Sequence, residues 1–360
     1  MKLTIDQTNF LKGIGILLIM FHNFFHLLPP FIGENEFDWD ATRVYKLGTT
    51  LFNSPSAFFN IAFSYFGHYG VQIFIVLSGY GLSMKYLQNN EKIKLVPFMI
   101  NRVSKLYPVY VLSIIFLIIT FLLRDSRVLN VYEMRDLLFN LSFVNNFLPN
   151  KALNINGPWW FFSLIVQLYA VFPLFFFLLK EKKMKYVHGI IFLILFYLIF
   201  VFLQPLLLKY DLNILFLFLG HLPEFVLGMV LAFKPEFYRK KYFLILLSIA
   251  LFVLGNFIEF LFPLTFISIS FFLVRSLIWL ENYIHNAIRR NIITLGEISL
   301  YVFAFHGFLR QPFAQYSQEA SETIKIVYAI LFSIISLLIA LFGKRIILFI
   351  KARIKINNNE

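Results

Sequence analysis

A small set of ionisable side chains falls inside long apolar segments of this 360-residue chain, where such groups are costly. His22 and His26 lie one helical turn apart in the first of these segments, and His22 falls near its middle. A neutral imidazole has a pKa close to working pH, so His22 is suited to act as a general base. Glu224 is predicted to orient a histidine or to accept a proton. The remaining members are His221, Arg275, Glu297 and His306, and each is also consistent with a structural role.

A basic pair and an aromatic cluster flank other apolar segments. Arg102 and Lys105 are three residues apart, so one helical turn brings both to the same face. Such a pair at the membrane surface could bind a phosphate, and contact with lipid headgroups is the alternative. Trp159, Trp160 and Tyr169 gather where another apolar segment begins. They are predicted to contact a ligand or to form an aromatic belt at the membrane surface.

The composition shows which kind of element must position these residues. Hydrophobic residues make up 59% of the chain and charged residues 14%, whereas soluble domains carry about 25% charged residues. The apolar segments are long enough for membrane-spanning helices and lack the two-residue alternation of β-barrel strands. A soluble enzyme, a disulfide scaffold and a nucleic-acid binder are therefore excluded, despite a net charge of +13. We predict an all-α polytopic integral membrane protein.

The apolar segments predict about ten transmembrane helices. They lie near residues 11–30, 63–84, 106–123, 158–180, 186–207, 212–233, 242–260, 263–281, 292–313 and 323–343. Lys and Arg concentrate in alternate connections, which predicts that both termini are cytoplasmic. We expect a single membrane-embedded domain over residues 1–360, in which residues 344–360 form a basic amphipathic tail that contacts anionic lipids.

Six short segments between residues 11 and 310 follow one another in an informative order. They are LKGIGILLIMFH, GVQIFIVLSGY, NRVSKLYPVY, PWWFFSLIVQLYAVFPL, PEFVLGMVLA and LYVFAFHGF. In this order they resemble the signature segments of the acyltransferase-3 family, which comprises bacterial membrane O-acyltransferases that modify cell-surface and secreted glycans. Each segment alone is weakly specific, but the set covers most of the chain. Ten spans is also the count typical of that family.

The resemblance implies transfer of an acyl group, commonly acetyl, from cytoplasmic acyl-CoA to a sugar hydroxyl at the outer face of the plasma membrane. Lys12 matches the first-helix basic residue of the family, while Arg102 and Lys105 match its basic pair, and these three are predicted to hold the CoA phosphates. Ser78 and Gly79 are predicted to line the path of the donor. Acyl-CoA is a substrate here, and neither a bound cofactor nor a metal is predicted. The expected partners are a glycan or lipid-linked saccharide and membrane lipids, without nucleic acid.

The first-helix histidine departs from the family spacing. The family places it eleven residues after the basic position, whereas His22 follows Lys12 by ten and Asn23 occupies the eleventh place. His22 is the predicted base, and His26 is the alternative.

On the acceptor side, the resemblance implies that the sugar meets side chains of two later helices. These are Trp159, Trp160, Tyr169 and His306.

Two other functions fit the same residues. Buried His and Glu groups could relay protons in a transporter or flippase for a lipid-linked saccharide. The chain could also be a non-catalytic subunit of glycan-export machinery. The basic pair and the glycine-rich segment near residues 66–86 favour an acyl-CoA donor over either alternative.

Overall fold

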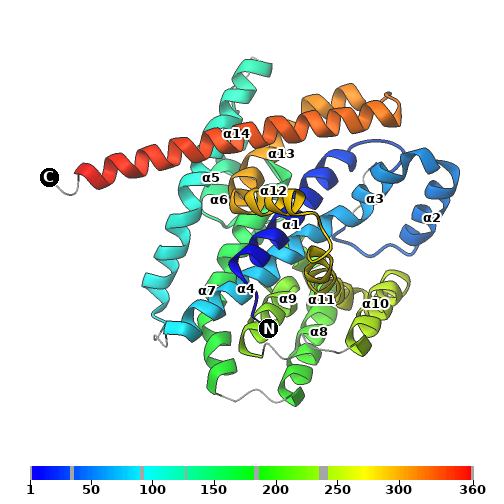
Figure 1. The fold of residues 1–360 in the computed structure, drawn as a ribbon, viewed down its shortest axis with the longest axis vertical. Helices are drawn as coiled ribbons and strands as arrows, with labels where there is room; N and C mark the ends of the chain where they lie inside the picture. Colours follow the sequence, from blue (N-terminus) through cyan, green and yellow to red (C-terminus); the bar gives the residue numbers. More distant parts are fainter. Residues whose placement is uncertain are drawn as a thin grey trace.

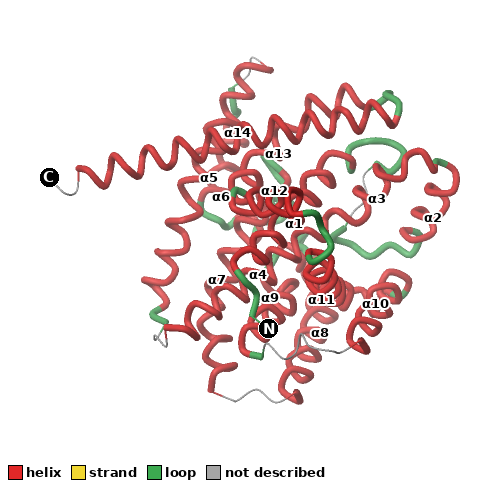
Figure 2. Tube along the Cα trace, viewed as in Figure 1, coloured by secondary structure: helices red, strands yellow, loops and turns green. Residues whose placement is uncertain are grey.

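The computed structural model describes residues 2–32, 36–89, 93–125, 128–181, 186–234 and 242–357. Within these ranges the regular structure is entirely helical, with no strand (Figures 1 and 2). The α-helices are α1 (Ile5–Phe25), α2 (Arg43–Asn53), α3 (Phe58–Phe66), α4 (Gly70–Asn89), α5 (Leu95–Asp125), α6 (Val131–Leu141), α7 (Trp160–Glu181), α8 (Tyr186–Leu208), α9 (Phe218–Phe233), α10 (Tyr242–Phe257), α11 (Phe262–Glu281), α12 (Asn286–Glu297), α13 (Ser299–Ser317) and α14 (Glu322–Asn357). The all-α prediction is confirmed.

Helices α1 and α4 lie at the centre of the bundle (Figure 1). Glycines let both of them approach a partner helix at backbone distance. A Cβ atom at Gly79 of α4 would overlap the carbonyl oxygen of Phe225 of α9, and one at Gly228 of α9 would overlap that of Val76. Small residues at such crossings permit close packing of apolar helices in a membrane. The same relation joins α1 and α12 through Gly13 and Gly296, so the two central helices are held rigidly.

Each of the ten predicted spans falls on helical residues, and the span 292–313 divides between two helices. Seven helical segments among the described residues are long and apolar enough to cross a membrane, and the bent pair α12–α13 brings the number to eight. The other two predicted spans coincide with α9 and α10, which have 16 residues each. A 16-residue helix is about 24 Å long, which is shorter than the hydrocarbon core of a bilayer. The chain is thus a multi-pass membrane protein, while the count of ten crossings and the orientation of the termini stay predictions.

The structure differs from the predicted layout at two helix boundaries. The segment 292–313 is not one straight helix, because α12 and α13 meet at 78° around Ile298. Helix α12 is polar and amphipathic, unlike α13, and its Arg289 forms an ion pair of 2.7 Å with Glu281 of α11. At the other end, α14 continues past residue 344 as one helix to Asn357.

Candidate functional site

His22 lies in the last turn of α1, and its ring is oriented by the backbone of α3. Thr4 begins the helix with a capping box that it shares with Gln7. His22 is 5% exposed, and its Nδ1 lies 3.0 Å from the carbonyl oxygen of Ser64. A carbonyl can only accept, so Nδ1 carries the proton and donates. Nε2 therefore has the lone pair and is the atom that can accept a proton or bind a cation.

Glu36 faces that atom from the connection that follows α1. Its Oε1 lies 3.5 Å from Nε2 of His22. Burial of Glu36 favours the neutral acid, but once His22 is protonated its positive charge and its Nε2–H hydrogen bond, with the charges of His68 and His26, outweigh it. They hold the pKa of the Glu36 carboxyl well below its ordinary value. The carboxylate can thus stabilise an imidazolium that forms when His22 accepts a proton.

Two more histidines surround His22. The ring centroid of His26 lies 5.0 Å from that of His22, and the centroid of His68 lies 5.4 Å away. Gly67 makes the second approach possible, since a Cβ there would lie 2.7 Å from Cβ of His22. Neither ring nitrogen of buried His68 has a hydrogen-bond partner among the described residues, nor does Nδ1 of His26. Three imidazoles therefore meet beside one carboxylate.

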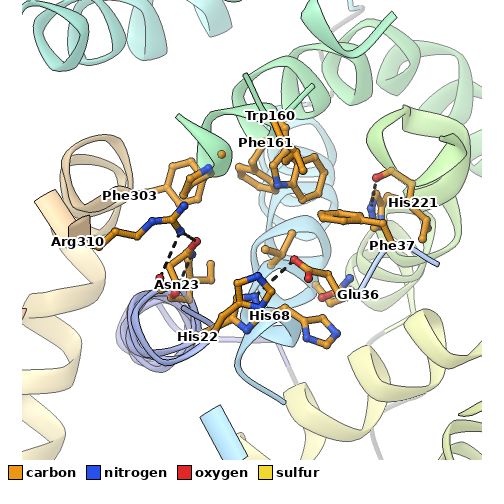
Figure 3. A pocket seen from close by; sticks show the side chains of 18 of the residues that line it. His22, Asn23, Glu36, Phe37, His68, Trp160, Phe161, His221, Phe303 and Arg310 are labelled. Carbon is orange, nitrogen blue, oxygen red and sulfur yellow. Dashed lines mark hydrogen bonds and ion pairs between the residues drawn. The ribbon is translucent and has the colours of Figure 1, made fainter. Parts of the chain in front are cut away.

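These side chains line a cavity of about 360 Å³, which we call the histidine chamber (Figure 3). Its walls come from α1, the connection after α1, α4, the start of α7, α9 and α13. The polar members of the lining are His22, Asn23, His26, Glu36, His68, Gln72, His221 and Arg310.

Arg310 brings a buried positive charge into this chamber from α13. Its Nη1 donates to Oδ1 of Asn23 at 2.5 Å and lies 3.3 Å from the Asn23 carbonyl oxygen (Figure 3). Its Nε has no hydrogen-bond partner among the described residues. A fixed guanidinium with a spare donor is suited to bind a carbonyl oxygen that gains negative charge.

An aromatic wall faces the histidines. The rings of Phe37 and Trp160 are 5.4 Å apart in an edge-on arrangement, and Trp160 stacks on His221 at 5.9 Å. Nε2 of His221 lies 2.9 Å from the Leu215 carbonyl, and its Nδ1 lies 3.2 Å from Oε1 of Glu224. Since Nε2 donates to the carbonyl, a second proton lies between Nδ1 and Glu224. The pair fixes the His221 ring, which in turn supports Trp160.

A second cavity of about 520 Å³, the basic chamber, lies further toward the beginning of α1. Lys12 and Arg102 line it together with Glu297, Ser78 and Tyr169. Three of these five residues, Lys12, Ser78 and Arg102, were predicted as donor contacts, and the structure brings them to one cavity from three helices. Tyr169 was predicted to contact the sugar but lies in this chamber, because it follows Trp160 by nine residues along α7.

Phe161 and Phe303 line both chambers. Phe161 comes from the first turn of α7 and Phe303 from α13, and their ring centroids are 5.3 Å apart. The two cavities therefore meet at one pair of rings.

The other predicted site residues lie outside the two linings. Trp159 is fully buried in the core, where its Nε1 donates to the Ala304 carbonyl at 2.9 Å. His306 is also fully buried and bonds to the carbonyl oxygen of Phe303 at 2.9 Å. Gly79 packs against α9, as described above. Glu224 lies behind His221, and Lys105 is exposed on α5 beyond the cavity that Arg102 lines.

Several chamber residues were not predicted from the sequence. Glu36 lies in an acidic connection and His68 near the end of an apolar segment, so neither stands out in the sequence as a candidate. Arg310 follows His306 by one helical turn and so lies within the same helix. The spacing of Arg310 from His306 was the one feature of the sequence that could have identified it as a site residue. The approach of Glu36 to His22 depends on how the chain folds back after α1, which no local pattern encodes.

Comparison with known proteins gives one match. The family model described as an acyltransferase domain, of the acyltransferase-3 type, matches residues 5–345. Neither the curated proteins nor the solved structures gave a significant match.

Proposed function

Because the chain belongs to the acyltransferase-3 family, we propose that it transfers an acyl group, most simply acetyl, from cytoplasmic acyl-CoA to a hydroxyl of a cell-surface or lipid-linked glycan. Acyl transfer is the general chemistry of the family. The donor, the acceptor and the transfer to the outer face of the plasma membrane are the specific parts of the proposal.

One observation carries this proposal: the basic chamber and the histidine chamber meet at Phe161 and Phe303. Transfer across a membrane needs a donor site and a base that lie on opposite sides of a narrow passage. Lys12 and Arg102 are suited to phosphates, because ammonium and guanidinium groups form charge-assisted hydrogen bonds to them. The acyl end of the donor then reaches His22 between the two rings.

The donor side uses the basic chamber. Lys12 and Arg102 hold CoA phosphates at the cytoplasmic mouth, and exposed Lys105 adds charge next to it. The pantetheine arm follows the cavity past Ser78 and Tyr169 toward the rings. Glu297 also lines this chamber, and its negative charge partly offsets that of the two basic side chains.

The acceptor side uses the histidine chamber. The sugar stacks against Trp160 and Phe37, since aromatic rings bind the apolar faces of amphipathic ligands. Its hydroxyl gives a proton to Nε2 of His22 while the hydroxyl oxygen attacks the thioester carbonyl carbon. Arg310 stabilises the oxygen that becomes negative, and Glu36 stabilises the imidazolium. The C–S bond then breaks, and the thiolate takes the proton and leaves as CoA.

Direct transfer agrees best with this arrangement. The chain has no cysteine, which removes a thioester acyl-enzyme. Ser78 lines the basic chamber, whereas the histidine base lines the other cavity, so an acyl-serine would lack an adjacent base.

The test uses full-length protein in sealed proteoliposomes, given acetyl-CoA labelled in the acetyl group and a total glycan extract. We expect label in the glycan with wild type and none with His22→Ala. Movement of a lipid-linked saccharide across the bilayer without label would support a flippase and overturn this proposal.

A further inference from the structure

His22, His26 and Glu36 form a set of metal-ligating side chains that the acyl-transfer chemistry leaves unexplained as a group. One nitrogen of each histidine and one carboxylate oxygen of Glu36 all lie within 4.8 Å of one another. Base catalysis needs only one of the two imidazoles. The set is also enclosed, since His22 is buried and the other two side chains are only partly exposed.

The orientation of His22 matches that of a metal ligand. Its Nδ1 donates to the Ser64 carbonyl at 3.0 Å, which directs the lone pair of Nε2 into the cluster. Metal-bound histidines generally donate their second N–H to a carbonyl or carboxylate in this way. Nε2 and Oε1 of Glu36 are 3.5 Å apart. Two ligands at the usual distances from a tetrahedral Zn²⁺ ion are separated by about 3.4 Å.

The helix supplies the second ligand at a favourable spacing. Positions i and i+4 lie on one face, so His22 and His26 present their rings side by side. His26 keeps a buried Nδ1 without a hydrogen-bond partner among the described residues. His68, whose two nitrogens also lack partners there, borders the cluster. Buried polar nitrogens of this kind are costly unless something binds them.

We propose that His22, His26 and Glu36 bind a divalent transition-metal ion of the Zn²⁺ class, with the fourth coordination position open to the histidine chamber. Two imidazoles and one carboxylate are a ligand set that Zn²⁺ accepts with an open position. Nε2 of His22 cannot hold a metal ion and accept a proton from the sugar at the same time. Bound Zn²⁺ therefore inhibits acyl transfer, and this second part rests on the proposed function.

Metal binding is tested without reference to activity. Full-length protein without a polyhistidine tag is stripped with a chelator, dialysed against Zn²⁺ and analysed by mass spectrometry for metal content. Co²⁺ provides an absorption spectrum that reports tetrahedral coordination. We expect one ion per chain for wild type and a loss of affinity of roughly tenfold or more for His26→Ala and for Glu36→Gln.

The matched control is His285→Asn, which removes an exposed histidine at the start of α12 and keeps a side chain able to cap it. Its Zn²⁺ binding is expected to equal that of wild type. Size-exclusion profiles and melting temperatures identify any variant that has not folded. A folded His26→Ala or Glu36→Gln protein that binds Zn²⁺ as wild type does, or a wild type that binds none, overturns the site.

Inhibition is measured in the labelled-acetyl assay over a Zn²⁺ titration. We expect Zn²⁺ to lower the wild-type rate at least tenfold and a chelator to restore it. Zn²⁺ binding by a protein that transfers no acyl group under any condition would overturn the proposed function and leave the site intact. Activation by Zn²⁺ would overturn the inhibitory role.

Discussion

Oδ1 of Asn23 accepts a hydrogen bond of 2.5 Å from Nη1 of Arg310, although 287 positions separate the two residues. Asn23 stands eleven residues after Lys12, where the family places its first-helix histidine. In this chain the side chain at that position, Asn23, binds the guanidinium of Arg310. The ring of the neighbouring His22 faces Ser64 and Glu36 instead. An Asn amide cannot serve as the proton acceptor, so His22 remains the proposed base and His26 the alternative.

Replacement of His22 by Ala should lower acyl transfer by roughly 100-fold or more, because it removes the proton acceptor of the reaction. The rate is measured with saturating labelled acetyl-CoA and glycan extract. The matched variant is His26→Ala, which removes the neighbouring imidazole and is expected to retain most of the activity. Near-normal activity of His22→Ala together with an inactive His26→Ala would move the base to His26.

Replacement of Arg310 by Gln should lower kcat by about 100-fold and change KM for acyl-CoA little, since the guanidinium acts on charge that develops during transfer. Asn23→Ala removes the hydrogen-bond partner but keeps the charge, so we expect a smaller loss. Steady-state kinetics for both substrates separate the two effects. An equal rise in KM with unchanged kcat would assign Arg310 to binding alone.

Replacement of Arg102 by Gln should raise KM for acetyl-CoA about tenfold, because the variant loses a charge-assisted contact to a phosphate. Lys105→Gln is the matched control one turn away on the same helix. Lys105 is exposed outside the basic chamber, so Lys105→Gln should raise KM for acetyl-CoA less than Arg102→Gln does. The increase caused by Lys105→Gln should disappear at high salt. Calorimetry of CoA binding tests the same difference without catalysis, and we expect Arg102→Gln to lose more affinity than Lys105→Gln. Equal losses from both variants would contradict the difference that the cavity predicts.

Asp136 should stabilise the protein only above acid pH. Its Oδ2 accepts hydrogen bonds from Lys151 at 3.0 Å and from Asn154 at 2.7 Å. Burial disfavours its charge, but these two hydrogen bonds and the charge of Lys151 outweigh that effect and lower the pKa of Asp136 below its ordinary value. A lowered pKa means that this stability is fully present above about pH 4 and is lost as the pH falls through the folded value.

The test compares wild type with Asp136→Asn. At pH 7 we expect a lower melting temperature for the variant, which corresponds to a loss of about 1–3 kcal/mol. The two curves should approach one another as the pH falls through the lowered folded-state pKa of Asp136. We also expect weaker binding of the acceptor glycan, because the Lys151–Asn154 segment leads into the turn before Trp160. A difference that does not depend on pH would show that the carboxylate charge has no part in it.

Phe161 and Phe303 should limit the access of water to the thioester. Phe161→Leu opens the contact while it keeps an apolar side chain, so we expect faster hydrolysis of acetyl-CoA without acceptor. Release of free CoA thiol measures this reaction. Phe162→Leu is a control at the adjacent position, because Phe162 lines only the basic chamber. Hydrolysis that is unchanged in Phe161→Leu would contradict a role for the rings in excluding water.

The fold could be predicted because its main determinant is local. About twenty apolar residues in succession require a helix in a membrane, and each of the ten predicted spans lies on helical residues. The break at Ile298 could not be predicted in this way. The polar helix α12 there packs through contacts with other helices, such as the ion pair of Arg289 with Glu281 of α11.

The site could be predicted only where a residue was unusual in its own segment. His22 stood out as a polar group in apolar surroundings, Arg102 as part of a basic pair and Lys12 through the family resemblance, and the structure places them on the two chambers. Trp159 and His306 stood out equally but pack in the core, because motif membership does not tell on which face of a helix a side chain lies. Glu36 and His68 reach His22 through tertiary packing alone.

The contact between Phe161 and Phe303 also matters for maintenance of the membrane potential. A passage that admits a thioester and stays open would leak protons and small ions, and each elementary charge that crosses a 100 mV potential dissipates about 2.3 kcal/mol. In the proposed transfer, the two rings, with centroids 5.3 Å apart, separate the chambers when no donor is bound. An acyl chain that parts them would fill the gap it creates, so the proposal requires a passage that conducts neither protons nor ions during transfer.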